Sequence, residues 1–354
     1  MNFSELYKNN ISDVEEVLNA IWCSESASES QKQYAEQIRK LIGTELFAPE
    51  NAVPVVQCMN LYRPVSPDKV EQAKALVGGL WTSIYDPYEH QYQCWKHLLA
   101  ESVNGKPKSI CVTTGTGSGK TECFMMPLVH NLAEIKKGLS KEYMMEIQAL
   151  FLYPLNALME DQKERLEELL KRVEETTQVR LTYAVYNGDL LEEGPKDSDR
   201  PKERARKEKI LDHMRGAYWV ENPTTHEREK KYKYEHMLYT RKQVRDTPPN
   251  ILLTNPTMLE YILLRKKDER LIDPLKKSLK WVAIDETHTY TGAGATELAM
   301  LLRRVLLAFD VDADRVRWAT SSATFGNGSD PEAEKRQLKD FIAGITGNKI
   351  SQIE

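Results

Sequence analysis

The stretch TTGTGSGKTE (113–122) decides the fold of this 354-residue chain. It lies between a short apolar run, SICVT (109–113), and an apolar helical segment, CFMMPLVHNLAEI (123–135). Such a loop binds nucleotide phosphates, because its glycines turn backbone amides toward them, its lysine reaches the outer phosphates and its hydroxyl residue holds Mg²⁺. The residues in these positions are Thr116, Gly117, Ser118, Gly119, Lys120 and Thr121. The stretch therefore predicts a phosphate-binding loop between a strand and a helix, with ATP and Mg²⁺ as cofactors, although Thr114 replaces the first glycine of the pattern.

A second strongly apolar run, WVAI, is followed directly by the carboxylates Asp285 and Glu286. Phosphoryl transfer to water requires a carboxylate that orients the metal and a group that positions the attacking water. We expect Asp285 to hold Mg²⁺ together with Thr121, and Glu286 to polarise the water. His288 is expected to sense the phosphates or to couple to a neighbouring strand. Together with Lys120, these residues form the predicted catalytic group.

Short apolar runs alternate with helical segments from about residue 84 onward. Continuous apolar strands that alternate with helices are typical of a parallel sheet covered on both faces. With right-handed crossovers, this order predicts an α/β fold of the P-loop NTPase kind, a RecA-like doubly wound parallel sheet with functional residues at the carboxyl ends of its strands. The predicted strands are 109–113, 149–153, 179–186, 250–254, 280–285 and 316–322.

Three regions are predicted along the chain. Residues 1–80 hold no catalytic signature and are expected to form a small helical accessory region, with either a packing role or a docking role. Residues 81–345 are predicted to form the RecA-like domain, and 346–354 a connector. A segment at about 191–245 interrupts the domain and holds 15 Lys and Arg against 11 Asp and Glu. It is predicted to be a charged helical insertion, and its basic and aromatic residues leave a nucleic-acid surface as the alternative.

The composition restricts what the chain binds and where it acts. Its net charge of −4 means that any nucleic-acid surface must be a local patch. The sequence has no window of 18 apolar residues and no basic leader before an apolar core, so no membrane partner is expected and a cytoplasmic location is predicted. The five cysteines are scattered without a C-x-x-C pair, which favours free thiols in a reducing compartment over a zinc site.

Taken in order, the motifs between residues 85 and 325 resemble those of superfamily 2 helicases of the DExH type. Motifs I, II and III are similar to TTGTGSGKTE, IDETH (284–288) and SSAT (321–324). The remaining resemblances are motif Ia in FLYPLNALMEDQ (151–162), motif Ib in LLTNPTMLEYILLR (252–265), the small glycine motif in YNGD (186–189) and the adenine-reading Q motif in YEHQ (88–91). The residues of these motifs are similar to those of a bacterial branch of the superfamily, which includes YprA-like and Lhr-like proteins and the large anti-phage helicases of Druantia or DISARM type.

The resemblance implies a role for each matching position. Gln91 would contact the adenine, and the residues of motif I would bind the phosphates and Mg²⁺. Ser322 and Thr324 would couple the nucleotide state to the grip on nucleic acid. The residues expected to face the backbone of one nucleic-acid strand are Pro154, Asn156, Gly188, Thr254 and Asn255. Amides and hydroxyls of this kind hold phosphates without reading the base sequence.

The resemblance also implies a partner domain. Superfamily 2 helicases close two RecA-like domains over ATP, and the second supplies arginines that stabilise the transition state. No Q-x-x-G-R-x-G-R-like run occurs in this sequence. The chain is therefore predicted to be the first motor half of an ATP-dependent helicase or translocase acting on single-stranded or duplex nucleic acid, with DNA favoured. The second domain would come from the same longer polypeptide or from another chain, and a defence-system protein is a further candidate partner. An ATP-binding nucleic-acid clamp without turnover is the alternative.

Overall fold

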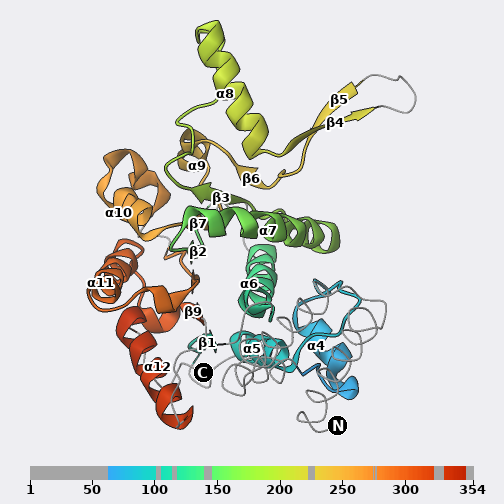
Figure 1. The fold of residues 1–354 in the computed structure, drawn as a ribbon, viewed down its shortest axis with the longest axis vertical. Helices are drawn as coiled ribbons and strands as arrows, with labels where there is room; N and C mark the ends of the chain where they lie inside the picture. The colour runs from blue at the N-terminus through green and yellow to red at the C-terminus, as the bar shows by residue number, and fades with distance from the viewer. Residues whose placement is uncertain are drawn as a thin grey trace, which may run out of the picture. The chain divides into compact units, whose positions relative to one another are not determined.

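A seven-stranded parallel sheet forms the centre of the protein in the computed structural model (Figure 1). The structure describes residues 63–100, 105–113, 118–138, 146–221, 228–273, 275, 277–322 and 331–347. The chain divides into two compact units, Met1–Arg63 and Pro64–Glu354, and the sheet lies in the second. Of the helical region predicted for 1–80, residues 1–62 lie outside the described residues, as does the predicted connector from residue 348 onward.

The strands of this sheet are short, largely apolar and parallel to their neighbours. Their order across the sheet is β1–β9–β8–β2–β7–β3–β6. Their bounds are β1 (Ile110–Thr113), β2 (Ala149–Leu152), β3 (Tyr183–Tyr186), β6 (Met237–Leu238), β7 (Ile251–Thr254), β8 (Trp281–Ile284) and β9 (Arg317–Ser322). The predicted α/β fold is confirmed, since every predicted strand segment contains one of these strands and all run in the same direction.

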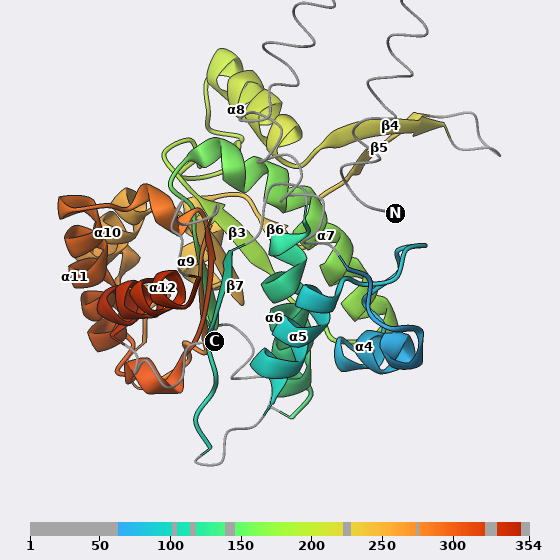
Figure 2. The ribbon, with the colours of Figure 1, turned by 60° about the horizontal axis from the view of Figure 1, so that its bottom comes forward.

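Helices cover both faces of the sheet, as Figure 2 shows. The helices on one face are α4 (Val70–Leu76), α5 (Glu89–Leu99), α6 (Lys120–Lys137) and α7 (Asn156–Thr177). Those on the other face are α9 (Arg241–Asp246), α10 (Pro256–Leu264), α11 (Ala293–Ala308) and α12 (Pro331–Thr346). The described residues also form short 3-10 turns: η2 (Pro67–Lys69), η4 (Lys266–Leu271), η6 (Thr287–Thr289) and η7 (Ala313–Arg315).

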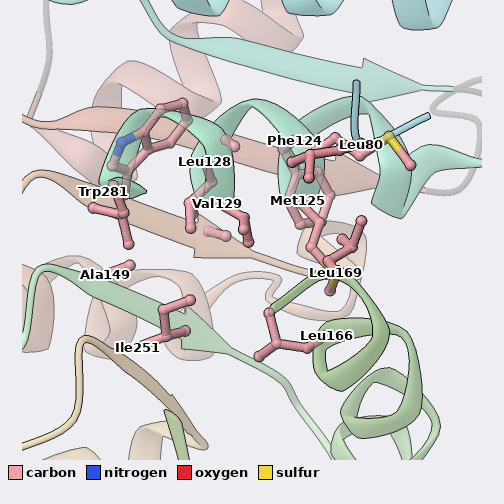
Figure 3. Close-up of a cluster of buried hydrophobic side chains, with 14 of the residues drawn as sticks. Leu80, Phe124, Met125, Leu128, Val129, Ala149, Leu166, Leu169, Ile251 and Trp281 are labelled. Atoms are coloured by element: carbon pink, nitrogen blue, oxygen red, sulfur yellow. The ribbon is translucent and has the colours of Figure 1, made fainter. Parts of the chain in front are cut away.

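Each face of the sheet carries its own apolar core, because side chains alternate along a strand. Ala149 and Phe151 of β2 lie in the core under α5, α6 and α7, whereas Leu150 and Leu152 lie in the opposite core. Figure 3 shows the first core, where side chains of α6 and α7 meet Trp281 and the small strand residues. Each large side chain buried in this way contributes about 1.5–3 kcal/mol, so the two cores hold the strand ends firmly in register.

Residues 64–80 pack within the second unit, although the sequence pattern groups them with the amino-terminal region. Five of their side chains are buried in the core under α5 and α6: Val65, Val70, Ala73, Val77 and Leu80. The segment is also held from α7, because Arg172 Nη1 donates a hydrogen bond of 3.0 Å to the carbonyl oxygen of Leu80. The segment therefore supports the outer side of α5 and α6.

The charged segment 191–245 is only partly helical, in contrast to the prediction. Helix α8 (Pro201–Met214) is followed by an antiparallel hairpin of β4 (Ala217–Glu221) and β5 (Arg228–Tyr232), and then by β6 and α9. Strand β6 pairs with β3, so the segment also adds an edge strand to the main sheet. The sequence conceals β4 and β5 because their side chains are mainly exposed and show no apolar alternation. In both ribbon views α8 and the hairpin extend beyond the end of the sheet formed by β3 and β6 (Figures 1 and 2).

Candidate ATPase and nucleic-acid site

The carboxyl ends of the strands gather the predicted motifs along one edge of the sheet. Pairing places Thr113 beside Ser322, and Leu152 beside both Ile284 and Thr254. Because parallel strands end at the same edge, the loops that follow β1, β9, β8, β2, β7 and β3 leave this edge in that order. The order separates the motifs into a phosphate side, with motifs I, III and II, and a strand-binding side, with motif Ia, motif Ib and the small glycine motif.

The described part of the phosphate-binding loop leads directly into α6. Gly119 caps this helix with a left-handed backbone at φ 71° and ψ 37°. Ser118 is buried, and Lys120 and Thr121 are half-buried in the first helical turn, while Thr116 and Gly117 lie outside the described residues. The first-turn amides of a helix have no partner within it, and the helix dipole favours an anion at this end. These residues therefore fit a nucleotide phosphate.

Helix α5 supports this loop through Gln91, which is only 1% exposed. Its Nε2 donates to the carbonyl oxygen of Gly119 at 3.3 Å, and its Oε1 accepts from the amide of Tyr88 at 2.9 Å. His90 Nε2 donates to the carbonyl oxygen of Ser118 at 2.9 Å. Burial lowers the pKa of His90, although the bond to Ser118 opposes the shift. Gln91 thus positions the loop in this structure, and its contact with adenine stays a prediction.

Motif II continues the ladder between β8 and β2 before it turns away. The amide of Asp285 donates to the carbonyl oxygen of Leu152 at 3.0 Å. Glu286 then has a left-handed backbone at φ 50° and ψ 47°, which is uncommon for a residue with a Cβ and which clusters at functional sites. His288 Nδ1 lies 3.2 Å from Glu286 Oε2, within ion-pair range. The strained turn therefore brings the two carboxylates and the imidazole into one short stretch after β8.

Ser321 joins motif III to these carboxylates, and the sequence prediction missed it. Its Oγ donates to Asp285 Oδ1 and accepts from the amide of Glu286 at 3.2 Å. The coupling role was predicted for Ser322, which is fully buried at the end of β9, and for Thr324, which lies outside the described residues. Successive strand residues lie on opposite faces of a sheet, so Ser321 and Ser322 lie on different faces and Ser321 is the one that reaches Asp285.

Tyr153, directly after β2, is a second residue beside motif II that the sequence did not single out. It is fully buried, and its hydroxyl has no hydrogen-bond partner among the described residues. Burial, and then the charge of Asp285, raise the pKa of Tyr153 well above its usual value, so the hydroxyl stays protonated. Nearby, Arg165 Nη1 of α7 lies 3.2 Å from Glu122 Oε1 in the first turn of α6. This ion pair connects α6 on the phosphate side to α7, which follows β2 on the strand-binding side.

On the strand-binding side, hydrogen bonds tie three strand ends together. Asn255 caps α10, where its Oδ1 accepts from the amide of Met258 at 2.8 Å. Its Nδ2 donates to Asn156 Oδ1 at 2.9 Å, which joins motif Ib to motif Ia. Thr254 is fully buried, and its Oγ1 donates to the carbonyl oxygen of Tyr186 at 2.8 Å. The structure therefore brings Asn156, Thr254 and Asn255 together, with Thr254 acting as a support.

A cavity of about 610 Å³ opens beside these residues, and its wall includes Pro154 and Asn255. Tyr290 also lines it, and its hydroxyl has no hydrogen-bond partner within the described part of the chain. Burial, and then the charge of Asp285, raise the pKa of Tyr290 to about 12. Gly188 is exposed after β3 and is not among the residues that line this cavity. Tyr290 therefore offers a hydroxyl donor that the sequence pattern did not single out.

Residues 88–203 match the family model of the DEAD/DEAH box helicase. This part of the chain is similar to a DEAD/DEAH box helicase domain. The match begins at the predicted Q motif and includes the phosphate-binding loop, motif Ia and the small glycine motif.

The domain is similar to several larger helicases. The Druantia protein DruE of Escherichia coli (strain UMEA 4076-1) is 26% identical over 386 residues, which cover 88% of this chain and 21% of DruE. The uncharacterized ATP-dependent helicase YprA of Bacillus subtilis (strain 168) is 25% identical over 275 residues, which cover 78% of this chain and 27% of YprA. These matches confirm the predicted resemblance to the YprA-like and Druantia-type branch, and the chain spans 21–27% of these relatives' length.

Among solved structures, the DUF1998 helicase MrfA bound to DNA is 22% identical, with a TM-score of 0.46. The alignment covers 83% of this chain and 30% of MrfA. Within the part of the chain that the structure describes, no helix combines the length and the apolarity that crossing a membrane requires.

Proposed function

We propose that this domain binds ATP and Mg²⁺ on its phosphate side and one strand of nucleic acid on its strand-binding side. The observation that carries the proposal is the shared edge, at which the two sides meet between the adjacent strands β8 and β2. Hydrolysis at one side then drives helicase or translocase movement at the other. A second RecA-like domain, in the same longer polypeptide or in another chain, would close over the nucleotide.

On the phosphate side, the residues of α6 bind the phosphates, and those of motif II act on the metal ion and the attacking water. Lys120 and the first-turn amides of α6 neutralise and orient the outer phosphates. Thr121 and Asp285 would hold Mg²⁺, which supplies further charge neutralisation when it is bound. Glu286 positions the attacking water, and Ser321 keeps the Asp285 carboxylate fixed through its hydroxyl. The donor set of one hydroxyl and one carboxylate is the oxygen-rich kind that Mg²⁺ prefers.

On the strand-binding side, motifs Ia and Ib both contribute to the cavity wall, through Pro154 and Asn255, and Asn156 bonds to Asn255. Asn156 and Asn255 would hold the nucleic-acid backbone through their amides, and Tyr290 would donate its hydroxyl to a phosphate. The preference for DNA rests on the similarity to the Druantia-type helicases, as does a role in defence against phages. Comparing phage plating on cells that produce the wild-type protein or Lys120→Ala tests that role, and equal plating would exclude an ATP-dependent defence function.

The enzymatic proposal is tested by ATP hydrolysis with and without single-stranded DNA. The assay uses the chain together with any sequence that its gene encodes beyond Glu354. Lys120→Ala is expected to lower ATP affinity and turnover more than tenfold, which corresponds to about 1.4 kcal/mol. Lys137→Ala is the matched control, because Lys137 lies at the other end of the same helix and pairs there with Glu134 at 2.5 Å. Equal activity of the two variants would contradict the assignment of the phosphate site.

A second variant separates a motor from a passive clamp. Glu286→Gln is expected to keep ATP binding and to lose turnover, because the amide keeps the size of the side chain but not its charge. A loss of ATP affinity in this variant would contradict the role given to Glu286. A wild-type protein that binds ATP and DNA without any hydrolysis would instead support the clamp.

A further inference from the structure

Helix α8 carries an exposed basic stripe, which we define as Lys202, Arg206, Lys209 and His213. These positions are spaced by four, three and four residues, so at 3.6 residues per turn they share one face of the helix. All four side chains are exposed, and no ion pair involves them within the described ranges of the chain. Leu211, which lies half a turn away from the stripe, is the buried residue of this helix. The stripe therefore points away from the body of the domain.

The other basic residues of α8 are neutralised by neighbouring acids. Arg204 pairs with Asp197 at 2.9 Å and with Glu208 at 3.0 Å. Lys207 pairs with Asp199 at 3.0 Å. Like charges at these helical spacings destabilise an isolated helix slightly, and a bound anion would offset this cost. The separation of paired and unpaired cations thus leaves net positive charge on the outer face of α8, which would attract a polyanion.

The length of the stripe can be compared with the spacing of phosphates along a nucleic-acid strand. Its length along the helix is about 16 Å, from eleven residues at a rise of 1.5 Å each. A strand of DNA carries one phosphate charge for about every 3.4 Å of helix axis. The stripe is therefore long enough to face several successive phosphates of one strand.

The position of α8 places this row beyond the strand-binding side. The chain reaches α8 from β3, past Gly188, through a loop that α9 holds in place. Arg241 donates from its amide to the carbonyl oxygen of Leu191 and from Nη2 to that of Asn187, both at 2.8 Å. At the other end of α8, Arg215 stacks over Tyr232 of the hairpin with its guanidinium carbon 3.4 Å from the ring centre. Helix α8 is thus anchored at both ends and extends past β3 and β6 (Figure 1).

We propose that the basic stripe of α8 binds the sugar–phosphate backbone of nucleic acid that runs past the end of the sheet. This site deepens the proposed function, on which it rests, because it adds a second contact outside the motifs that follow the strands. It is independent of base sequence and of the bound nucleotide, since Lys202, Arg206 and Lys209 offer positive charge without a base-reading geometry and lie apart from α6.

The test is a triple variant, Lys202→Gln with Arg206→Gln and Lys209→Gln, which removes three charges and keeps good helix formers. The matched control is Lys266→Gln with Lys267→Gln and Arg270→Gln, three exposed cations on the 3-10 turn η4. Affinity of the whole chain for fluorescein-labelled DNA, duplex or single-stranded, is measured from about 50 to 200 mM salt. ATP affinity is measured in parallel and is expected to stay unchanged in both variants.

The stripe variant is expected to reduce the slope of log affinity against log salt by about 0.9 per lost contact on duplex DNA, or about 0.7 on a single strand. Three lost contacts would reduce it by about 2–3, with at least a tenfold loss of affinity at about 100 mM salt. The DNA, duplex or single-stranded, for which the stripe variant loses more of its salt slope is the ligand of the stripe. An unchanged slope in both arms, or an equal change in the control variant, overturns the inference. A loss of polyglutamate binding with unchanged DNA binding also overturns it, because an acidic protein would then be the occupant. The proposed function fails separately, if DNA does not stimulate ATP hydrolysis by the wild-type protein.

Discussion

Gly119 offers a sharp test of how the phosphate-binding loop is held. Its backbone lies in the left-handed region at φ 71°, and an added Cβ would lie 2.3 Å from Gln91 Nε2. Gln91 is buried and is also held by the amide of Tyr88, so its side chain has little room to move aside. Gly119→Ala should therefore combine a backbone strain with the loss of the bond from Gln91 to the loop.

The two contributions have separate magnitudes. A left-handed backbone costs an alanine about 1–2 kcal/mol. A buried amide that loses its partner costs about 1–3 kcal/mol. Gly119→Ala is therefore expected to lower the free energy of unfolding by about 2–5 kcal/mol. Gly79→Ala is the matched control, because Gly79 has φ 78° and an added Cβ there meets no atom within 4 Å. This control should show only the backbone contribution, about 1–2 kcal/mol.

The assay is a double-mutant cycle measured by urea unfolding of the whole chain. With Gln91→Ala already present, Gly119→Ala should cost only about 1–2 kcal/mol, so the coupling energy is about 1–3 kcal/mol. Gly79→Ala should cost the same in both backgrounds. Additive effects of Gln91→Ala and Gly119→Ala, within about 0.5 kcal/mol, would refute the contact between Gln91 and the loop.

Three further predictions follow from buried contacts. Ser321→Ala removes the hydroxyl that donates a hydrogen bond to the Asp285 carboxylate. Because a charge-assisted hydrogen bond is lost, DNA-stimulated ATP turnover should fall about 10- to 100-fold with little change in ATP affinity. A loss confined to ATP affinity would contradict this role of Ser321. Glu167→Ala removes the carboxylate 2.8 Å from Nδ1 of buried His236, which keeps only Glu174 at 2.9 Å from its Nε2. Urea unfolding should show a loss of about 1–3 kcal/mol, and no loss would contradict this buried hydrogen bond. Burial lowers the pKa of Lys136 to about 8, below about 10.4 in the unfolded chain. Between these two pKa values the unfolded chain binds more protons than the folded chain, so the stability contributed by Lys136 rises with pH. The difference in unfolding free energy between the wild-type protein and Lys136→Met should therefore grow from about pH 7.5 to about pH 10. A difference that stays constant over this range would contradict the lowered pKa of Lys136.

The strands of the main sheet were predictable because each is a continuous apolar run that ends in a motif. The hairpin was not, since AYWVE and REKKY pair mainly with each other and leave their side chains in solvent. Strand β6 has only two residues, and its pairing with β3 depends on contacts far apart in the chain. Local periodicity carries no information about such pairing.

Within the candidate site, the sequence identified motifs more reliably than the contacts inside them. The motif III serine that bonds Asp285 is Ser321, and the choice between neighbouring serines depends on strand register. Tyr153, directly after β2, and Tyr290, directly after η6, escaped notice because tyrosines are common in such connecting segments. Only burial beside the charge of Asp285 distinguishes these two.

The order of strands in space also has a consequence for biosynthesis. Within the described sheet, β1 lies at the edge and pairs only with β9, whose first residue comes 204 positions after Thr113. A nascent chain therefore completes β8, β2, β7, β3 and β6 while the strand that carries the phosphate loop still lacks its neighbour. Pairings so distant in sequence form late, because loop closure must precede them. A ribosome that stalls before Arg317 would release a protein whose strand-binding side can assemble while its nucleotide side cannot.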